Sequence, residues 1–379
     1  MAGEETQSLE PLATEPQEAA QSVQGPTPHE LAMMIAGDDD RAKQILRIVE
    51  GSEDFKIVHD SLTHDSALAL PTLSLEAFGS DSASLLSRII EWLKKLIDTV
   101  FDEMTAHQGA VMYVERAAAD LKVMSRDRRT HSVSSGTFKV DTRVQNLCVR
   151  YRPIEQANGL VMALRNMDKL LRAYYGYQPL QAAPQILSAA NGADEAGVVQ
   201  QMQSASPMKL QTSGAVFSHP EVDNWLASAP LMGNVRLVLK KRESGSDVDR
   251  IRGMMLRLLP EEVTPRPMPT SIDFVRFSLS NSDQLLSQIQ DTARFMANIN
   301  QASVRAQRKR QLETVVGFLT NLQREAGRSS EPASVDRIAT IAGLVEQYVD
   351  WIVNPYNSLY GLACRNLRAA LRVCELNAQ

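Results

Sequence analysis

Apolar and polar positions alternate most regularly between Ser82 and Asp102. Apolar side chains recur there every three or four residues, which is the spacing of one face of a helix. The apolar positions are Leu85, Leu86, Ile89, Ile90, Leu93, Leu96, Ile97, Val100 and Phe101. The positions between them carry Arg88, Glu91, Lys94, Lys95, Asp98 and Asp102. Ser82 and Ser84 are both suited to cap the first turn, so the pattern predicts an amphipathic helix of about five turns.

The C-terminal part of the chain also has a helical pattern. Residues 281–327 contain few helix breakers and a periodic set of apolar positions, which predicts either one long helix or two joined helices. A further helix is expected over 334–353, ending at Asn354-Pro355, because proline interrupts the hydrogen bonding of a helix interior. A last helix is expected over 356–376.

Helical patterns cover three more stretches, 109–124, 154–176 and 179–191. Residues 191–213, by contrast, are rich in Gly, Gln and Ser and are expected to form a loop with at most one helical turn.

The middle of the chain also contains strand-like segments. Residues 137–152 lose the helical period and gain Thr, Val and Tyr, which predicts one or two short strands. Further strands are expected at 234–241 and 271–279, with a short helix or strand and a proline-rich connector between them. The whole pattern predicts a mainly α (α+β) fold in which long amphipathic helices flank a small central strand-containing region.

The first 76 residues differ from the rest. Residues 1–28 are rich in Glu, Gln, Ala, Thr and Pro and are expected to be disordered, because they cannot bury enough apolar surface to offset the entropy of ordering. One or two short helices are expected over 29–66, followed by a linker. The chain then divides into an acidic, partly disordered segment (1–76) and three regions: N-terminal helical (77–130), mixed α/β (131–280) and C-terminal helical (281–379).

Composition and charge agree with this division. The 379 residues are 44% hydrophobic and 22% charged, which is ordinary for a soluble protein with a core, and only 5% aromatic. The net charge of −5 conceals an asymmetry, since residues 1–76 carry fifteen acidic and four basic side chains and residues 77–379 carry 30 and 36. An acidic segment of −11 therefore precedes a basic body of +6, and such asymmetry indicates that one part neutralises the other or meets a polyanion.

Cysteine usage and the length of the hydrophobic runs indicate the cellular compartment in which the protein folds. Cys148, Cys364 and Cys374 are odd in number and form no CxxC pair, which favours reduced thiols in a non-oxidising compartment. No secretory signal opens the sequence, and no uncharged run approaches the roughly 20 residues needed to cross a bilayer. The protein is therefore expected to be made and folded in a cytoplasm.

The motifs of enzyme chemistry are absent from the sequence. It has no Walker A loop, dinucleotide GxGxxG, GxSxG elbow or HExxH. His59 and His64 are five residues apart and miss the face that one helix offers to a metal, and scattered residues such as Ser213, His219 and Asp223 have no triad context. We therefore expect no enzyme activity, catalytic residue, metal or cofactor. A pocket that gathers His107, His131 or His219 with carboxylates would revive an enzymatic interpretation.

Three basic clusters are suited to contact phosphate groups. The first is Arg305, Arg308, Lys309 and Arg310; the others are Arg126, Arg128 and Arg129, and Lys240, Lys241 and Arg242. No aromatic platform lies among them, so base-specific recognition is not indicated. A solvated helix face is the favoured interpretation, and nonspecific DNA contact by the first cluster remains an alternative.

The helix predicted over 85–104 is also suited to a membrane surface, because Trp92 lies beside Lys94 and Lys95. Core packing is the favoured interpretation, because Asp98 and Asp102 lie on the polar face.

A short motif lies at the boundary between the acidic segment and the basic body. Ser74-Leu75-Glu76 stands in a proline-containing stretch that is expected to be extended and accessible, and it precedes Ala77. Ser8-Leu9-Glu10 repeats it near the start. A tripeptide is weak on its own, and only its position at the charge boundary, ahead of the first strong helix, makes the first copy informative.

In this setting the sequence resembles virion proteins of large tailed bacteriophages, especially giant phages related to phiKZ. Their internal head proteins often carry an N-terminal propeptide that a prohead maturation protease removes after a small-x-Glu motif, in contexts like the "SLEAF" of residues 74–78. The segment "PLMGNVRLVL", 230–239, is similar to a turn and strand of such proteins. The resemblance implies cleavage after Glu76, with Glu10 as a secondary site.

The resemblance also implies a location and partners. It implies a non-enzymatic protein of the capsid interior, assembled in the host cytoplasm and either structural or ejected with the genome. Its partners would be the prohead maturation protease, other capsid or inner-head proteins, further copies of itself and packaged DNA, bound non-specifically. The alternative is a host-interacting or membrane-active effector that uses the helix 85–104.

Overall fold

A computed structural model describes residues 82–127, 136–192, 194–212, 216–217, 225–261, 267–326, 328 and 332–379. Its α-helices are α4 (Ser82–Asp127), α5 (Ala157–Gly176), α6 (Ala183–Asn191), α7 (Glu195–Ala205), α8 (Lys209–Thr212), α9 (Asp247–Arg252), α10 (Leu279–Ile299), α11 (Ala302–Ala326), α12 (Pro332–Val353) and α13 (Tyr356–Ala378). The 3-10 helices in the same described residues are η2 (Val144–Leu147) and η3 (Pro179–Ala182). The strands are β1 (Thr137–Val140), β2 (Cys148–Val149), β3 (Arg152–Pro153), β4 (Trp225–Ala227), β5 (Val235–Lys240), β6 (Met255–Pro260) and β7 (Ile272–Val275). The predicted mainly α (α+β) fold is confirmed.

Helix α4 is a single helix of 46 residues, although the sequence pattern divides it into two. Gly109 does not end it, because the buried face continues beyond the glycine with Val111, Val114 and Ala118. A helix-interior glycine costs only about 1 kcal/mol, which this burial more than offsets.

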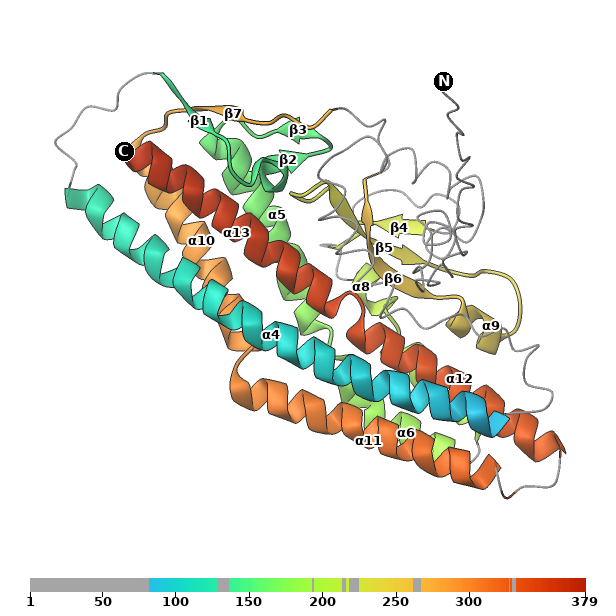
Figure 1. The fold of residues 1–379 in the computed structure, drawn as a ribbon. Coiled ribbons are helices and arrows are strands. Elements are labelled where there is room, and N and C mark those ends of the chain that lie inside the picture. The colour runs from blue at the N-terminus through green and yellow to red at the C-terminus, as the bar shows by residue number, and fades with distance from the viewer. Residues whose placement is uncertain are drawn as a thin grey trace, which may run out of the picture. The chain divides into compact units, whose positions relative to one another are not determined.

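The other long helices run alongside α4 and are broken where α4 is not (Figure 1). α10 and α13 contact the C-terminal half of α4, whereas α11 and α12 accompany its N-terminal half. The path from α10 to α11 breaks at Asn300, and the path from α12 to α13 breaks at Asn354-Pro355. The predicted stop at Asn354-Pro355 is confirmed, and the stretch 281–327 is two helices.

The buried apolar side chains of the described residues form two clusters that share α4. One cluster contains Met104 and the residues that follow it on α4, together with α5, α10, α13 and the strands. The other contains the α4 residues from Ile90 to Phe101, together with α6, α7, α11 and α12. The level at which α4 passes from one cluster to the other is the level at which its neighbours break.

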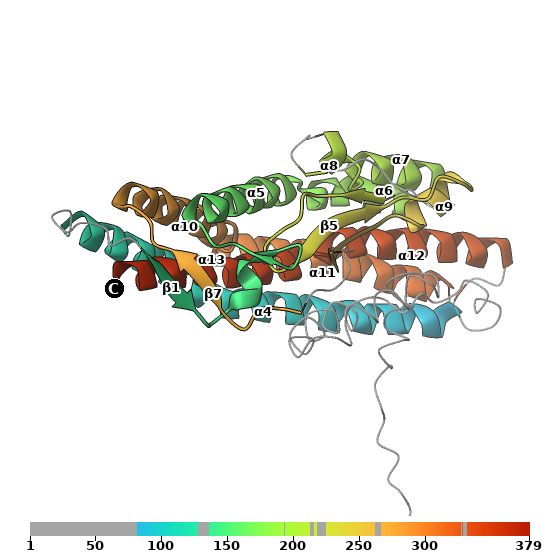
Figure 2. The same ribbon diagram turned by 90° about the horizontal axis from the view of Figure 1, so that it is seen from above.

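Within the described residues, the strands form three small antiparallel sheets. β4, β5 and β6 form one sheet in that order, with β5 central, and β2 pairs with β3 in a hairpin. β1 pairs with β7, so that Thr137 faces Val275 across more than a third of the chain. Figure 2 shows α5 and β5 on the opposite side of α12 and α13 from α4. The strands predicted within 137–152, 234–241 and 271–279 are present.

The prediction of a loop for 191–213 is wrong. α7 and α8 occupy most of it, and Asp194 caps α7 by accepting a hydrogen bond from the backbone N–H of Gly197 at 2.9 Å. Val198 and Met202 are fully buried in the cluster that contains α12. Tertiary burial and a good N-cap thus outweigh the weak helix propensity of this Gly- and Gln-rich segment.

Candidate functional site

The residues of both cleavage motifs lie outside the described part of the chain. These are Ser74, Leu75, Glu76 and Ala77 in the first motif and Ser8, Leu9 and Glu10 in the second. His59 and His64 lie outside it as well, as do His131 and His219. Cleavage at these motifs stays a prediction.

Arg305, the first residue of the basic cluster on α11, is used to hold the helices together. Its guanidinium donates hydrogen bonds to Oε1 of Gln108 at 2.6 Å and to Oδ1 of Asn300 at 3.1 Å, and also to the backbone carbonyl of Asn300. It therefore links α4 to the break between α10 and α11.

Arg308 lies on the face of an aromatic ring. Its guanidinium carbon is 4.5 Å from the ring centroid of Tyr356, the first residue of α13. Among the described residues, no carboxylate forms an ion pair with it. A cation over an aromatic face is held by the ring quadrupole and keeps its N–H edge available for an anion.

The remaining two residues of the cluster face outward. Lys309 pairs with Asp98 of α4 at 2.8 Å, and Nε of exposed Arg310 donates to the carbonyl of Ala306 at 3.3 Å. The four cations therefore do not form one phosphate-contacting surface. Their contact with DNA stays a prediction, for which Arg310 and Lys309 are the accessible members.

Two asparagines connect the broken helices to α4. Nδ2 of fully buried Asn300 donates to the carbonyl of Met104 at 2.6 Å. Nδ2 of Asn357, at the start of α13, donates to the carbonyl of Val100 at 3.2 Å and to Oε2 of Glu103 at 2.8 Å. Both breaks are thus fixed to α4 within two turns of each other.

A cluster of tyrosines fills the same level of the molecule. The ring centroids of Tyr175 and Tyr356 are 4.9 Å apart and nearly perpendicular, and those of Tyr174 and Tyr175 are 5.1 Å apart. The Tyr175 hydroxyl donates to the carbonyl of Tyr356 at 2.8 Å. Burial raises the pKa of Tyr174 and of Tyr175 well above the ordinary value, so both stay neutral.

A cavity of about 290 Å³ lies over these tyrosines. One wall is the face of α11 that carries Val304, Gln307, Arg308 and Gln311, and the other is the segment 177–181 after α5. Tyr174, Tyr175, Ile352 and Tyr356 complete the lining. Two segments that are far apart in sequence thus face each other across a small polar and aromatic space.

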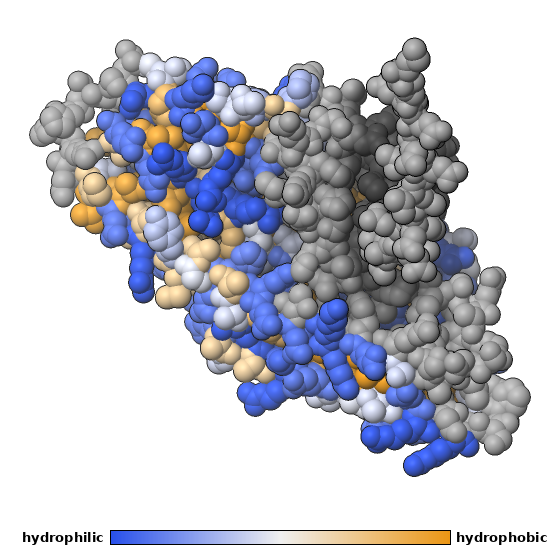
Figure 3. Space-filling view, viewed as in Figure 1, coloured by the Kyte–Doolittle hydropathy of each residue, from blue (hydrophilic) through white to orange (hydrophobic). Residues whose placement is uncertain are grey.

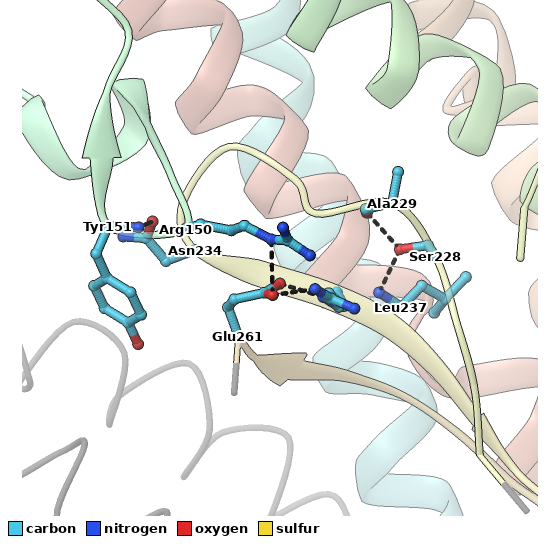
Figure 4. A network of polar contacts seen from close by, with 8 residues as sticks. Arg150, Tyr151, Ser228, Ala229, Asn234, Leu237 and Glu261 are labelled. Atoms are coloured by element: carbon cyan, nitrogen blue, oxygen red, sulfur yellow. Dashed lines mark hydrogen bonds and ion pairs between the residues drawn. The ribbon is translucent and has the colours of Figure 1, made fainter. Parts of the chain in front are cut away.

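A second polar cluster lies at the β2–β3 hairpin (Figure 4). Arg150 and Tyr151 form its two-residue turn with backbone φ angles of 53° and 59°. Residues other than glycine, asparagine and aspartate rarely adopt this left-handed backbone conformation. The Tyr151 N–H donates to Oδ1 of Asn234 at 2.7 Å, and the buried carboxylate of Glu261 accepts from Nε of Arg150 at 3.3 Å and also from Arg236. These hydrogen bonds stabilise the strained turn, so its unusual backbone conformation is accounted for by structure and needs no functional role.

The chemistry available elsewhere in the described residues is limited. They contain no group of three or more His, Cys, Asp or Glu side chains placed to hold a metal ion. Cys148, Cys364 and Cys374 are buried, and burial raises the pKa of Cys364 to about 12, so its thiol is unreactive. Burial lowers the pKa of His107, which lies beside Tyr360 with ring centroids 6.2 Å apart.

The apolar face of the predicted membrane-active helix belongs to the core. Ile90, Leu93, Ile97, Val100 and Phe101 are all buried. The polar face is exposed and hydrophilic along the N-terminal half of α4 (Figure 3). None of the helices in the described residues is both long and apolar enough to span a membrane. A membrane role for 85–104 would therefore require this face to leave the core.

Sequence reasoning identified one cavity residue and missed the others. Arg308 was marked by its place in a basic cluster, but Tyr174, Gln178, Gln307 and Gln311 carry no sequence signal, because only the fold brings them together. Comparisons with protein-family models, with curated proteins and with solved structures found no match to this chain.

Proposed function

We propose that the protein is a bacteriophage virion protein of the head interior that a prohead maturation protease cleaves after Glu76. In this proposal it has no enzymatic activity of its own and is either structural or ejected with the genome. Its partners are the protease, other capsid or inner-head proteins, further copies of itself and, non-specifically, packaged DNA.

The observation that carries the proposal is the coincidence of two boundaries in the sequence. The acidic segment ends and the basic body begins at Glu76, and the small-x-Glu motif ends at the same residue. A cut after Glu76 would therefore remove a segment whose net charge is −11. The body left behind has a charge of +6, which suits a polyanionic neighbour.

The test is the intact mass and N-terminal sequence of the protein from purified particles. A chain that starts at Ala77 supports the proposal. A start at Pro11 would support processing but contradict the removal of the whole acidic segment, here called the charge switch. An intact N-terminus, or absence of the protein from particles, would contradict both processing and the charge switch. Glu76→Gln should block the cut, and Glu10→Gln, which alters the same motif in a different setting, is the matched control that should leave it unchanged.

A further inference from the structure

The cavity between α11 and the segment 177–181 has a positive wall without a compensating charge. None of its lining residues is acidic, and Arg308 is held on the ring of Tyr356, 4.5 Å from its centroid. A guanidinium fixed in this way presents its remaining N–H groups with little further loss of entropy. The cavity is therefore prepared for an anionic group.

The lining of the cavity includes the hydroxyl group of Tyr174. Tyr174 is 4% exposed, and within the part of the chain that the structure describes its hydroxyl makes no hydrogen bond. Two neighbouring tyrosines differ, because the Tyr175 hydroxyl donates to the carbonyl of Tyr356 and the Tyr177 hydroxyl to the carbonyl of Ala205. The Tyr174 hydroxyl is therefore available to donate a hydrogen bond to a ligand in the cavity that Tyr174 lines.

The rest of the lining suits a flat, polar ring. Glutamines line both walls, Gln307 and Gln311 on α11 and Gln178 and Gln181 opposite, where Nε2 of Gln181 donates to Oε1 of Gln178. Amides supply both donors and acceptors, as the edge of a nucleobase requires, and aromatic rings supply surfaces for stacking. The volume of about 290 Å³ is at the lower end for small-ligand sites, which limits the ligand to a single nucleotide.

We infer that this cavity binds a nucleoside monophosphate, with the phosphate on Arg308, the Tyr174 hydroxyl donating to the ligand, and the base among the glutamine amides. This goes beyond the proposed role in the head, which concerns processing and bulk charge. The test uses purified full-length protein, so its outcome is independent of where the protein is found in particles.

Binding is to be measured by isothermal titration calorimetry with each of the four deoxynucleoside monophosphates. At least one should bind with a dissociation constant below about 1 mM, while the matching nucleoside and inorganic phosphate each bind at least about tenfold more weakly. Arg308→Gln should weaken binding about ten- to a hundredfold, because it removes a charge-assisted contact, and Tyr174→Phe should weaken it about three- to tenfold. Arg310→Gln, on the same helix but outside the cavity, should have no effect.

Four results would overturn the inference. They are no binding of any monophosphate at 10 mM (roughly the limit of specific recognition), equal binding of the nucleoside, equal binding of phosphate alone, and equal weakening by Arg310→Gln. Each variant is first checked for an unchanged melting temperature. If Arg308→Gln fails that check, Tyr174→Phe, which removes a single oxygen atom, decides the matter.

Discussion

At the scale of single residues, Glu346 is the carboxyl group with the most unusual environment in the described structure. It lies on α12, one turn before Asp350, whose carboxylate is paired with Arg257 at 2.6 Å and accepts a hydrogen bond from Asn354 at 2.9 Å. Burial and, secondly, the negative charge of Asp350 raise the pKa of Glu346 to about 7, although Arg252 acts in the opposite direction. Glu346 therefore exchanges its proton near neutral pH.

The raised pKa predicts that the protein loses stability as pH rises. The folded state holds the Glu346 proton more tightly than the unfolded chain, so the contribution is complete below about pH 4.5 and is lost as pH rises through about 7. Glu346→Gln removes this dependence, and between pH 5 and pH 8 the variant should gain about 2–3 kcal/mol in unfolding free energy relative to the wild type. Urea unfolding at the two pH values measures the difference.

Glu91→Gln, which changes an exposed carboxyl on α4, is the control for this prediction and should behave like the wild type. Equal pH dependence of the wild type and Glu346→Gln would show that Glu346 is ionised in the folded protein at neutral pH.

At the scale of elements, the sequence predicts most helices well but not where every helix begins and ends. The period of apolar residues from Leu85 to Phe101 predicts α4, and Pro355 predicts the end of α12, because both signals are local. The break at Asn300 has no such signal, since its buried amide binds Met104 of a helix almost two hundred residues away. α7 was missed for the same reason, because the burial of Val198 and Met202, and not local propensity, decides its structure.

The candidate site shows the same limit more strongly. Arg308 is visible in the sequence as part of a basic cluster, but nothing local distinguishes it from Arg310. Only the arrangement of α11 over Tyr356 shows that one cation lines a cavity while the other faces solvent. Tyr174 and Gln178 join the site through tertiary structure alone. The cleavage motif is the reverse case, because its signal is entirely local.

The continuity of α4 across Gly109 makes a prediction about this element. An added Cβ at Gly109 meets no heavy atom within 4 Å, and the residue is exposed in the helix interior. Gly109→Ala should therefore raise the free energy of unfolding by about 0.5–1 kcal/mol, because alanine loses less backbone entropy on folding. Chemical denaturation measures this gain.

Alanine substitutions at two other glycines serve as comparisons for Gly109→Ala. Gly317 on α11 is equally open, so Gly317→Ala should give a similar gain. Gly361 differs, because an added Cβ would lie 3.3 Å from Nε2 of His107, and Gly361→Ala should give no gain. A loss of stability in Gly109→Ala would mean that α4 is not helical at this residue.

At the scale of the whole molecule, the charge division predicts that processing changes affinity for DNA. Residues 77–379 carry +6, whereas the full chain carries −5, so the processed form should bind duplex DNA more tightly than the full chain. Its affinity should fall roughly tenfold or more between 50 and 200 mM salt, as expected for two or three phosphate contacts. Fluorescence anisotropy with a labelled duplex of arbitrary sequence measures both effects.

Arg310→Gln should reduce the slope of the salt dependence by about one unit, because Arg310 is exposed. Equal affinity of the full chain and residues 77–379 for the duplex would argue against the charge switch, whatever the outcome of the nucleotide titrations.

The unbroken length of α4 also bears on how the molecule can deform. Both neighbouring helix paths break at one level, Asn300 and Asn354-Pro355, and breaks of this kind are natural positions for a hinge. The 46 residues of α4 contain no proline and cross that level intact, fixed there by the amides of Asn300 and Asn357. Any rotation of one buried cluster relative to the other must therefore bend α4 itself. Because bending a continuous helix strains its hydrogen bonds, α4 restrains the two clusters to a single relative orientation.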